Sequence, residues 1–184
     1  RSSNPAHADI PLDPGITLRV VARALEVVRE RSDLVLWGLY DRDAIAELFG
    51  SENSPNWRTG HKDIDVGSQP HSVLMVNLRK PAGTLLEHRY ADRFLAPDQF
   101  QWESQASTTV AGVKGRRILN HREQGRRIHL FIRYHTKDAD QKAEPYTYCG
   151  TLRAKRHEGE TPIRVWFELD TPLPDRLYRV WAGG

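Results

Sequence analysis

Six strand-like segments between residues 71 and 169 constrain the fold of this chain more than any other feature. In the last of them, apolar residues at the odd positions alternate with Arg164, Trp166 and Glu168, which predicts one buried face and one wetter face. No strand–helix–strand rhythm connects the segments, so a parallel sheet is not expected. The six segments are His71–Leu78, His88–Phe94, Phe100–Gln105, Arg127–Tyr134, Tyr146–Arg153 and Ile163–Leu169.

Helices are expected mainly before these strands. Apolar residues at helical spacing follow Thr17, a suitable N-cap, and predict an amphipathic helix. A second helix should begin after Asp41 and end at Gly50, whereas residues 51–71 have the Gly and Pro content of a loop. The sequence therefore predicts an α+β fold, a strongly bent antiparallel sheet or partly closed β-barrel with two or three peripheral helices. The expected organisation is a flexible tail over 1–16, a helical extension over 17–38, a main domain over 39–178 and a tail over 179–184.

Cysteine content and missing motifs limit the chemistry that this chain can perform. Cys149 is the single cysteine, which excludes an internal disulfide and a thiolate metal site and favours a reducing compartment, most simply the cytoplasm. No apolar run reaches the length of a membrane span, and the chain reads as a domain of a longer protein. The sequence has no GxSxG, Walker-type or HxxxH motif. We therefore expect a binding domain without catalytic residues, metal or cofactor.

Positive charge is concentrated between Ala111 and Lys137, where eight cations stand against the single anion Glu123, a net charge of +7. The whole chain carries only +3, so the remainder is net acidic. Such a concentration favours a polyanion, most commonly nucleic acid, although a merely solvated face is the alternative. Glycines beside paired arginines would let the backbone approach phosphates closely. The candidate DNA-backbone residues are Lys114, Arg116, Arg117, Arg122, Arg126 and Arg127.

Aromatic and polar residues also gather between Tyr90 and Gln105, in two predicted strands joined by a Pro-containing turn. Two flat rings and a carboxylate are what a pocket for a flipped nucleobase requires, since the rings stack and the carboxylate reads the base edge. The alternative is that the rings are ordinary strand-core residues and that Asp92 caps a turn. The candidate base-pocket residues are Tyr90, Asp92, Trp102, Ser104, Tyr146 and Tyr148.

Several blocks of the sequence together resemble a known bacterial domain family. They include YADRF, FQWESQASTT, NHREQGRRIHLFIR, PYTYCG and HEGETPIRVWFEL, and the resemblance spans roughly Leu39 to Leu177. Its most specific parts are the FxWxSQ and PYTYxG blocks. The family resembled lies at the C-terminus of helicases fused to phospholipase-D-type nucleases and in some HNH endonucleases. Its best-understood carriers resemble type IV restriction enzymes of phage defence, which cut DNA that contains modified cytosine.

A weaker similarity is to SRA domains, which flip methylated cytosine out of DNA. It implies that Tyr90 and Trp102 sandwich the base while Asp92 accepts from its amino group, although Arg93 stands where the SRA run has a second acid. The resemblances imply an SRA-like target-recognition domain, probing duplex DNA for modified cytosine, first of all 5-methylcytosine, beside a nuclease domain in the same polypeptide. Dimerisation through the full-length protein stays open. Other nucleic-acid features, such as a phosphorothioate, a single strand or RNA, and a protein-docking role are the alternatives.

Overall fold

The computed structural model describes residues 34–50, 57, 59–65, 69–79, 92–137 and 140–182. Their strands are β1 (Leu39–Tyr40), β2 (His61–Ile64), β3 (His71–Asn77), β4 (Arg93–Ala96), β5 (Gln99–Glu103), β6 (Arg127–Arg133), β7 (Tyr146–Glu158) and β8 (Arg164–Leu169). Their helices are α2 (Arg42–Leu48), α3 (Val113–Leu119) and α4 (Asp175–Ala182). The α+β class and the number of peripheral helices are confirmed over these residues.

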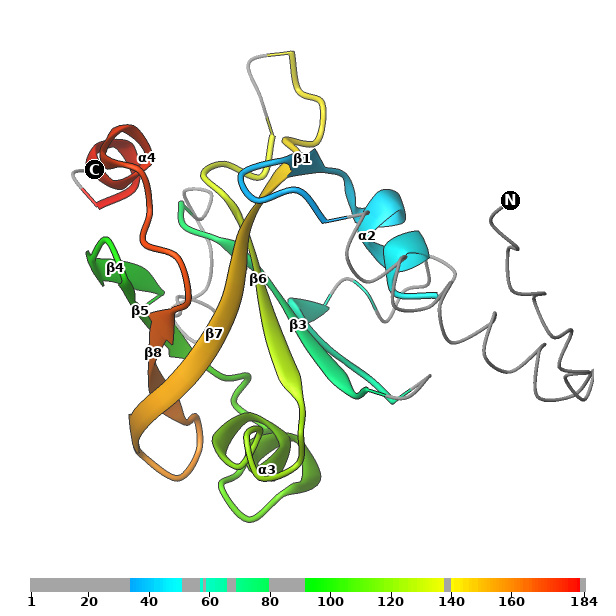
Figure 1. Cartoon of the computed structure of the whole chain (residues 1–184), viewed down its shortest axis with the longest axis vertical. Coiled ribbons are helices and arrows are strands. Elements are labelled where there is room, and N and C mark those ends of the chain that lie inside the picture. The colour runs from blue at the N-terminus through cyan, green and yellow to red at the C-terminus, as the bar shows by residue number, and fades with distance from the viewer. Residues whose placement is uncertain are drawn as a thin grey trace, which may run out of the picture. The chain divides into compact units, whose positions relative to one another are not determined.

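All the strands form one bent sheet in the order β2-β3-β6-β7-β8-β5-β4, with β1 paired to β7 (Figure 1). Its two ends, β2 and β4, do not pair with each other, so the sheet does not close into a barrel. Neighbouring strands are antiparallel except β3 and β6, which run parallel from His71↔Arg127 to Asn77↔Arg133. The expectation of a purely antiparallel sheet is wrong for this pair. The connection from β3 to β6 contains β4, β5 and α3, and so long a crossover lets two neighbouring strands run the same way.

Most of the predicted strands are present in the structure, but their first or last residues differ from the prediction. Residues 88–91 of the second predicted strand lie outside the described residues, and β4 begins at Arg93. The predicted loop over 51–71 contains β2, which was missed because only the first and last of its four residues are buried. Strand β7 continues beyond the predicted end at Arg153 to Glu158. Its last residues are mostly polar and exposed, and they lack the apolar alternation that predicts a strand.

Helix α2 forms as its sequence predicts. Asp41 caps it by accepting a hydrogen bond from the Ala44 amide at 2.8 Å. Gly50 follows the helix at φ +66°, a conformation that favours glycine. The Phe49 ring then packs against His129 and Phe131, with centroid distances of 5.0 and 6.4 Å. The helix thereby covers the face of β6 that points away from the main core.

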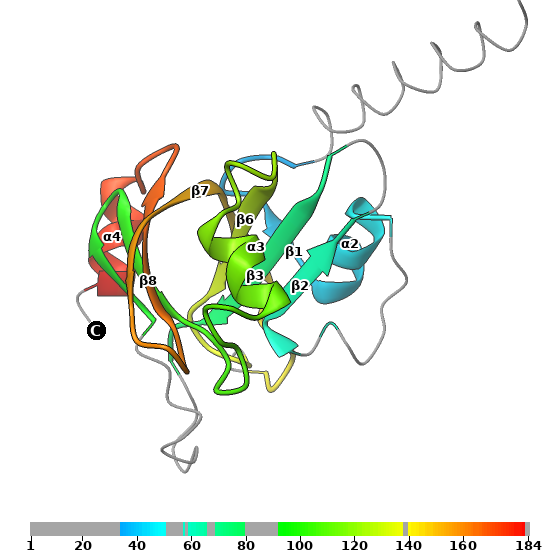
Figure 2. The same ribbon diagram turned by 90° about the horizontal axis from the view of Figure 1, so that it is seen from below.

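Helix α3 was not expected, since its GVKG start reads as a turn. Gly115 lies where a Cβ atom would come within 2.1 Å of the Thr109 carbonyl oxygen, so the close approach of these backbones requires glycine. One turn later Ile118 enters the main core. Figure 2 shows α3 in front of β6 and β3, in the middle of the view. The segment between the paired arginines is therefore partly a packed helix.

The C-terminal helix α4 runs across the boundary predicted at residue 178. Trp181 stacks on Phe94 with ring centroids 5.8 Å apart, and the Tyr178 hydroxyl donates to the Leu95 carbonyl at 3.2 Å. At the other boundary, residues 17–33 of the predicted helical extension and the tail over 1–16 lie outside the described residues. Trp37 and Gly38 form backbone hydrogen bonds with Tyr148 of β7 at 2.8 and 2.9 Å. The described unit thus extends on both sides of the predicted main domain.

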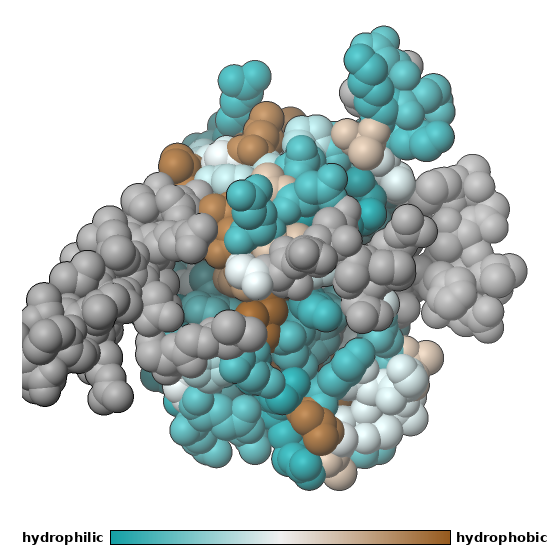
Figure 3. Space-filling view, turned by 90° about the vertical axis from the view of Figure 1, so that its right-hand side faces the viewer, coloured by the Kyte–Doolittle hydropathy of each residue, from teal (hydrophilic) through white to brown (hydrophobic). Residues whose placement is uncertain are grey.

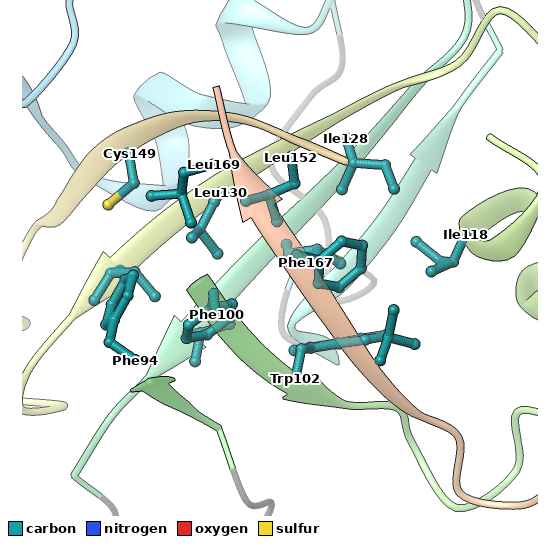
Figure 4. Close-up of a cluster of buried hydrophobic side chains, with 14 of the residues drawn as sticks. Phe94, Phe100, Trp102, Ile118, Ile128, Leu130, Cys149, Leu152, Phe167 and Leu169 are labelled. Carbon is teal, nitrogen blue, oxygen red and sulfur yellow. The ribbon is translucent and has the colours of Figure 1, made fainter. Parts of the chain in front are cut away.

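The main core fills the inside of the bent sheet. It contains inward residues of β3, β5, β6, β7 and β8, together with Ile118 of α3, and Figure 4 shows several of their side chains converging. On the opposite face of the sheet, the Phe49 ring at the end of α2 packs against His129 and Phe131 of β6, and Tyr148 of β7 packs on Phe131. We name this the α2-covered face. On the side that Figure 3 shows, apolar residues form separate spots among hydrophilic ones. No helix in the described part of the chain is long and apolar enough to span a bilayer.

Candidate nucleic-acid interface

A polar cleft lies where the chain turns from α3 into β6. Gly125, at φ +61°, permits the turn, and the Arg126 amide donates to the His121 carbonyl at 2.7 Å. Residues of this turn face Thr151, Arg153 and Asp170 across a cleft of about 310 Å³. We name this the arginine cleft.

Exposed cations surround the arginine cleft. Arg122 and Arg127 line it, are exposed, and form no ion pair with any residue that the structure describes. Lys114 and Arg116 are exposed on the adjoining α3, where the Arg116 guanidinium donates to the Ala111 carbonyl at 2.5 Å. Guanidinium groups with free donors suit phosphate oxygens, which they bind as forks.

The far wall of the arginine cleft is charged but internally paired. Asp170 lies 2.9 Å from Arg153 Nε and accepts a hydrogen bond from the Thr151 hydroxyl. Arg153 therefore offsets this carboxylate, and Arg122 and Arg127 leave the cleft net positive. Among the described residues that line the cleft, only His121 has an aromatic ring, and this residue is buried. The cleft thus suits a phosphodiester better than a base, which needs an exposed flat surface for stacking.

His121 holds the turn together through both nitrogens of its ring. Its Nδ1 donates to the Arg126 carbonyl at 3.1 Å, and its Nε2 accepts from the Ala154 amide at 3.2 Å. These two bonds together require the neutral ring. Burial is the main reason why the pKa of His121 is lowered.

Two of the candidate DNA-backbone arginines form ion pairs with carboxylates of the protein itself. The Arg126 side chain is only 4% exposed and pairs with Asp65, while Arg117 bridges Asp63 at 3.2 Å and Asp65 at 2.5 Å. Asp63 also accepts from His61 at 3.0 Å and Ser72 at 2.6 Å. We name these charged residues (Asp63, Asp65, Arg117 and Arg126) the buried ion cluster.

The buried ion cluster fixes α3 and the following turn to β2 and β3. Burial opposes ionisation of Asp63, but hydrogen bonds from His61, Ser72 and Arg117 outweigh it and hold the pKa of Asp63 well below its usual range. Arg126 therefore lacks the exposure that a backbone contact requires, and Arg117 is already paired. Lys114, Arg116, Arg122 and Arg127 are the candidates that the structure leaves at the surface.

The structure describes five of the six residues of the predicted base pocket. Tyr90 lies outside the described residues. Asp92 accepts a hydrogen bond from the Glu103 amide at 2.9 Å and so ties the start of β4 to the end of β5. Trp102 is 5% exposed in the main core, with ring centroids 6.2 Å from Phe167 and 5.8 Å from His61 (Figure 4). In this arrangement Trp102 presents no free ring face to a base.

The remaining three pocket candidates are also buried. The Ser104 hydroxyl accepts from the Ile163 amide at 2.9 Å and donates to the Gln105 carbonyl at 3.1 Å. Tyr146 lies beneath the Arg133 guanidinium, 4.5 Å from ring centroid to Cζ. Tyr148 packs on Phe131, on the α2-covered face and not in the main core that holds Trp102. The structure therefore does not bring these two tyrosines together with Trp102.

A chain of polar rings on the α2-covered face, of which His129 and Tyr148 are buried and His71 is half-buried, was missed by the sequence interpretation. His71 Nδ1 lies 3.0 Å from His129 Nε2, and His129 Nδ1 lies 3.0 Å from the Tyr148 hydroxyl. Burial, followed by the charges of His71 and Arg127, lowers the pKa of His129 to about 3. Burial is also the main reason why the pKa of Tyr148 is raised. Within the described ranges, no group of three His, Cys, Asp or Glu side chains is arranged to hold a metal ion.

The chain was compared with protein families and with known proteins. A family model described as a domain of unknown function (DUF3427) matches residues 34–180. Among solved structures, one described as "DNA modification-dependent restriction endonuclease AspBHI" is similar, with 17% identity, 82% of each chain covered and a TM-score of 0.48. None of the curated proteins matches the chain.

Proposed function

Since the chain belongs to the DUF3427 family, we propose that it serves as a DNA-binding target-recognition domain that reads modified cytosine in duplex DNA. The observation that carries the DNA-binding part is the set of exposed, unpaired cations around the arginine cleft. Arg122 and Arg127 have no carboxylate partner among the described residues, in contrast to Arg117 and Arg126. Cations left unpaired beside a concave surface are what a phosphate chain would neutralise.

The expected binding through this surface is moderate and depends on salt. Four exposed cations, Lys114, Arg116, Arg122 and Arg127, would neutralise at most about four phosphates, and each contributes about −0.9 to the slope of log K against log salt. Contacts of this kind position DNA but carry no sequence information. Recognition of a modified base must therefore come from a second group of residues.

The proposal of modified cytosine, and of base flipping, is supported by the sequence resemblances described above. Extruding a base costs a few kcal/mol, which stacking at about 1–3 kcal/mol and edge hydrogen bonds must offset. A buried methyl group adds only about 0.8 kcal/mol, so discrimination between methylated and plain cytosine is expected to be modest. Tyr90 and Asp92 remain proposed base contacts, whereas Trp102 could join them only by leaving the main core.

We further propose that the domain binds without catalysing and that a nuclease domain of the same polypeptide cuts the DNA. No cofactor is needed for such a role. Among the described residues that line the arginine cleft, none forms a set of nucleophile, base and oxyanion donors. Incubation of the chain with modified duplex and Mg²⁺ should leave the DNA intact.

The test is a DNA titration by fluorescence anisotropy with matched plain and 5-methylcytosine duplexes at several salt concentrations. Arg122→Ala with Arg127→Ala should weaken binding to both duplexes equally and flatten the salt slope by about 2, since two phosphate contacts are lost. Arg176→Ala with Arg179→Ala removes the same charge from the exposed side of α4 and is the matched control. Equal losses in both double variants would show that the arginine cleft is not the interface.

A further inference from the structure

Trp166 is an aromatic residue on the outward side of the sheet. Its neighbours in β8, Val165 and Phe167, point into the main core, so alternation turns Trp166 outward, and it is half-buried. Its ring is covered by the guanidinium of Arg156, whose Cζ lies 3.5 Å from the ring centroid. Arg156 is itself 56% exposed, pairs with Glu158 at 2.5 Å, and so can leave the ring without breaking into the core.

A second cleft, of about 330 Å³, lies beside this ring. We name it the tryptophan cleft. Its apolar part includes Leu95, which is 40% exposed, and its polar part includes Asp98, Gln99 and Glu168. Glu168 is paired with Lys155 at 2.8 Å. The side chains of Asp98 and Gln99 form no hydrogen bond with another described residue, so their donors and acceptors are available.

The two clefts adjoin on the outer surface of β7 and β8. Arg153 pairs with Asp170 in the wall of the arginine cleft, and its guanidinium also lies 3.9 Å from Glu168, which lines the tryptophan cleft. Both clefts therefore lie along one continuous row of charged side chains. A ligand that binds both must combine phosphates with flat rings.

We propose that the tryptophan cleft is a nucleobase site, in which the base displaces Arg156 and stacks on Trp166. A guanidinium and a nucleobase both stack on the flat face of an indole ring. The position of the Arg156 guanidinium on Trp166 therefore shows where a base can stack. Asp98 accepts a hydrogen bond from an exocyclic amino group, the contact by which acids recognise cytosine. The displaced Arg156 guanidinium is then free for the flanking phosphate.

This inference rests on the proposed DNA-binding function and deepens it by naming the place of the base. It differs from the pocket expected at Trp102, because the Trp166 ring can be uncovered by moving one exposed side chain. It applies equally to a base extruded from a duplex and to a base of an open strand. The experiment must therefore separate these two sources.

The test compares Trp166→Ala, Trp166→Phe and Asp98→Asn in the anisotropy titration, on 5-methylcytosine duplex, plain duplex and a single strand of the same sequence. Trp166→Ala should weaken binding to the preferred DNA between about 5- and 150-fold, the range of stacking strengths. Trp166→Phe, which keeps a flat ring, should retain most of the affinity, and it also serves if the alanine variant does not fold. Asp98→Asn should weaken binding to these DNAs more than it weakens binding to a control single strand with thymine in place of the cytosine.

A loss confined to modified duplex assigns the site to an extruded base, and a loss confined to the single strand assigns it to an open strand; both outcomes support a nucleobase site. If the parent binds DNA and loses affinity in the Arg122, Arg127 double variant, while Trp166→Ala and Asp98→Asn bind every DNA like the parent, the nucleobase site is refuted and the DNA interface stands. If the parent binds none of the three DNAs at low salt, the proposed function itself fails.

Discussion

Arg126 gives the sharpest test of how the positive charge of this chain is used. In the sequence it belongs to a cationic run that favours DNA, but in the structure its guanidinium is buried among Asp63, Asp65 and the His71 carbonyl. Arg126→Ala should therefore lower the free energy of unfolding, because it removes the partner of buried acceptors. The effect on DNA affinity should follow only from the loss of folded protein.

The size of the effect follows from the individual contacts. Asp65 is 46% exposed, so its pairing is screened and contributes about 0–1 kcal/mol. The half-buried His71 carbonyl loses a hydrogen bond of 2.5 Å from a charged donor, which costs about 1–3 kcal/mol. Asp63 lies 3.7 Å away and keeps Arg117 and His61, so it adds little. We expect a loss of about 1–4 kcal/mol.

Urea unfolding followed by far-UV circular dichroism measures this loss. Arg122→Ala, four residues earlier and exposed, is the matched control and should change the free energy of unfolding by less than about 0.5 kcal/mol. An Arg126→Ala variant that is as stable as the parent but binds DNA more weakly would refute the assignment of Arg126 to the buried ion cluster.

Two further predictions concern the interior. Trp102→Ala should destabilise the fold by about 3–5 kcal/mol in urea unfolding, the usual cost of removing a large core ring, whereas Trp166→Ala should cost much less; equal losses would contradict the different burial of the two rings. His129 has a pKa of about 3 in the folded protein, below the 6.5 of the free side chain, so its contribution to stability is complete above about pH 6.5 and is lost as the pH falls toward 3. The urea midpoint should fall between pH 7 and pH 5, and less so in His129→Gln; an identical fall in both would assign it to other groups.

The sequence predicted β8 well because a strand with one buried face shows a period of two. It could not predict which faces meet, since this depends on register and on the order of strands in space. Trp102 and Tyr148 are both aromatic strand residues, but one lies in the main core and the other under α2. The parallel pairing of β3 with β6 was likewise hidden, because residues 50 or more positions apart determine it.

The charge interpretation failed at two residues for a related reason. Counting cations between residues 111 and 137 cannot show that Asp63 and Asp65, more than 50 positions earlier, neutralise Arg117 and Arg126. Helix α3 was missed because Gly115 lowers its intrinsic helix propensity, although the close contact with Thr109 requires that glycine. The local sequence shows how many cations a segment contains, but only the tertiary contacts show how many of them remain unpaired at the surface.

The alternation in β8 contained a second indication of a base site, which the sequence interpretation missed. That strand places Arg164, Trp166 and Glu168 on its wetter face, and the structure confirms this pattern, with the odd positions buried and the even ones exposed or half-buried. Arginine and glutamate need no explanation there, but a tryptophan gains little from water and covers its ring with Arg156. An aromatic residue out of place on a polar face is better evidence for a stacking site than one among core residues. For that reason the base is expected at Trp166, where a flat ring can be exposed at small cost, and not at Trp102, where exposing the ring would open the core.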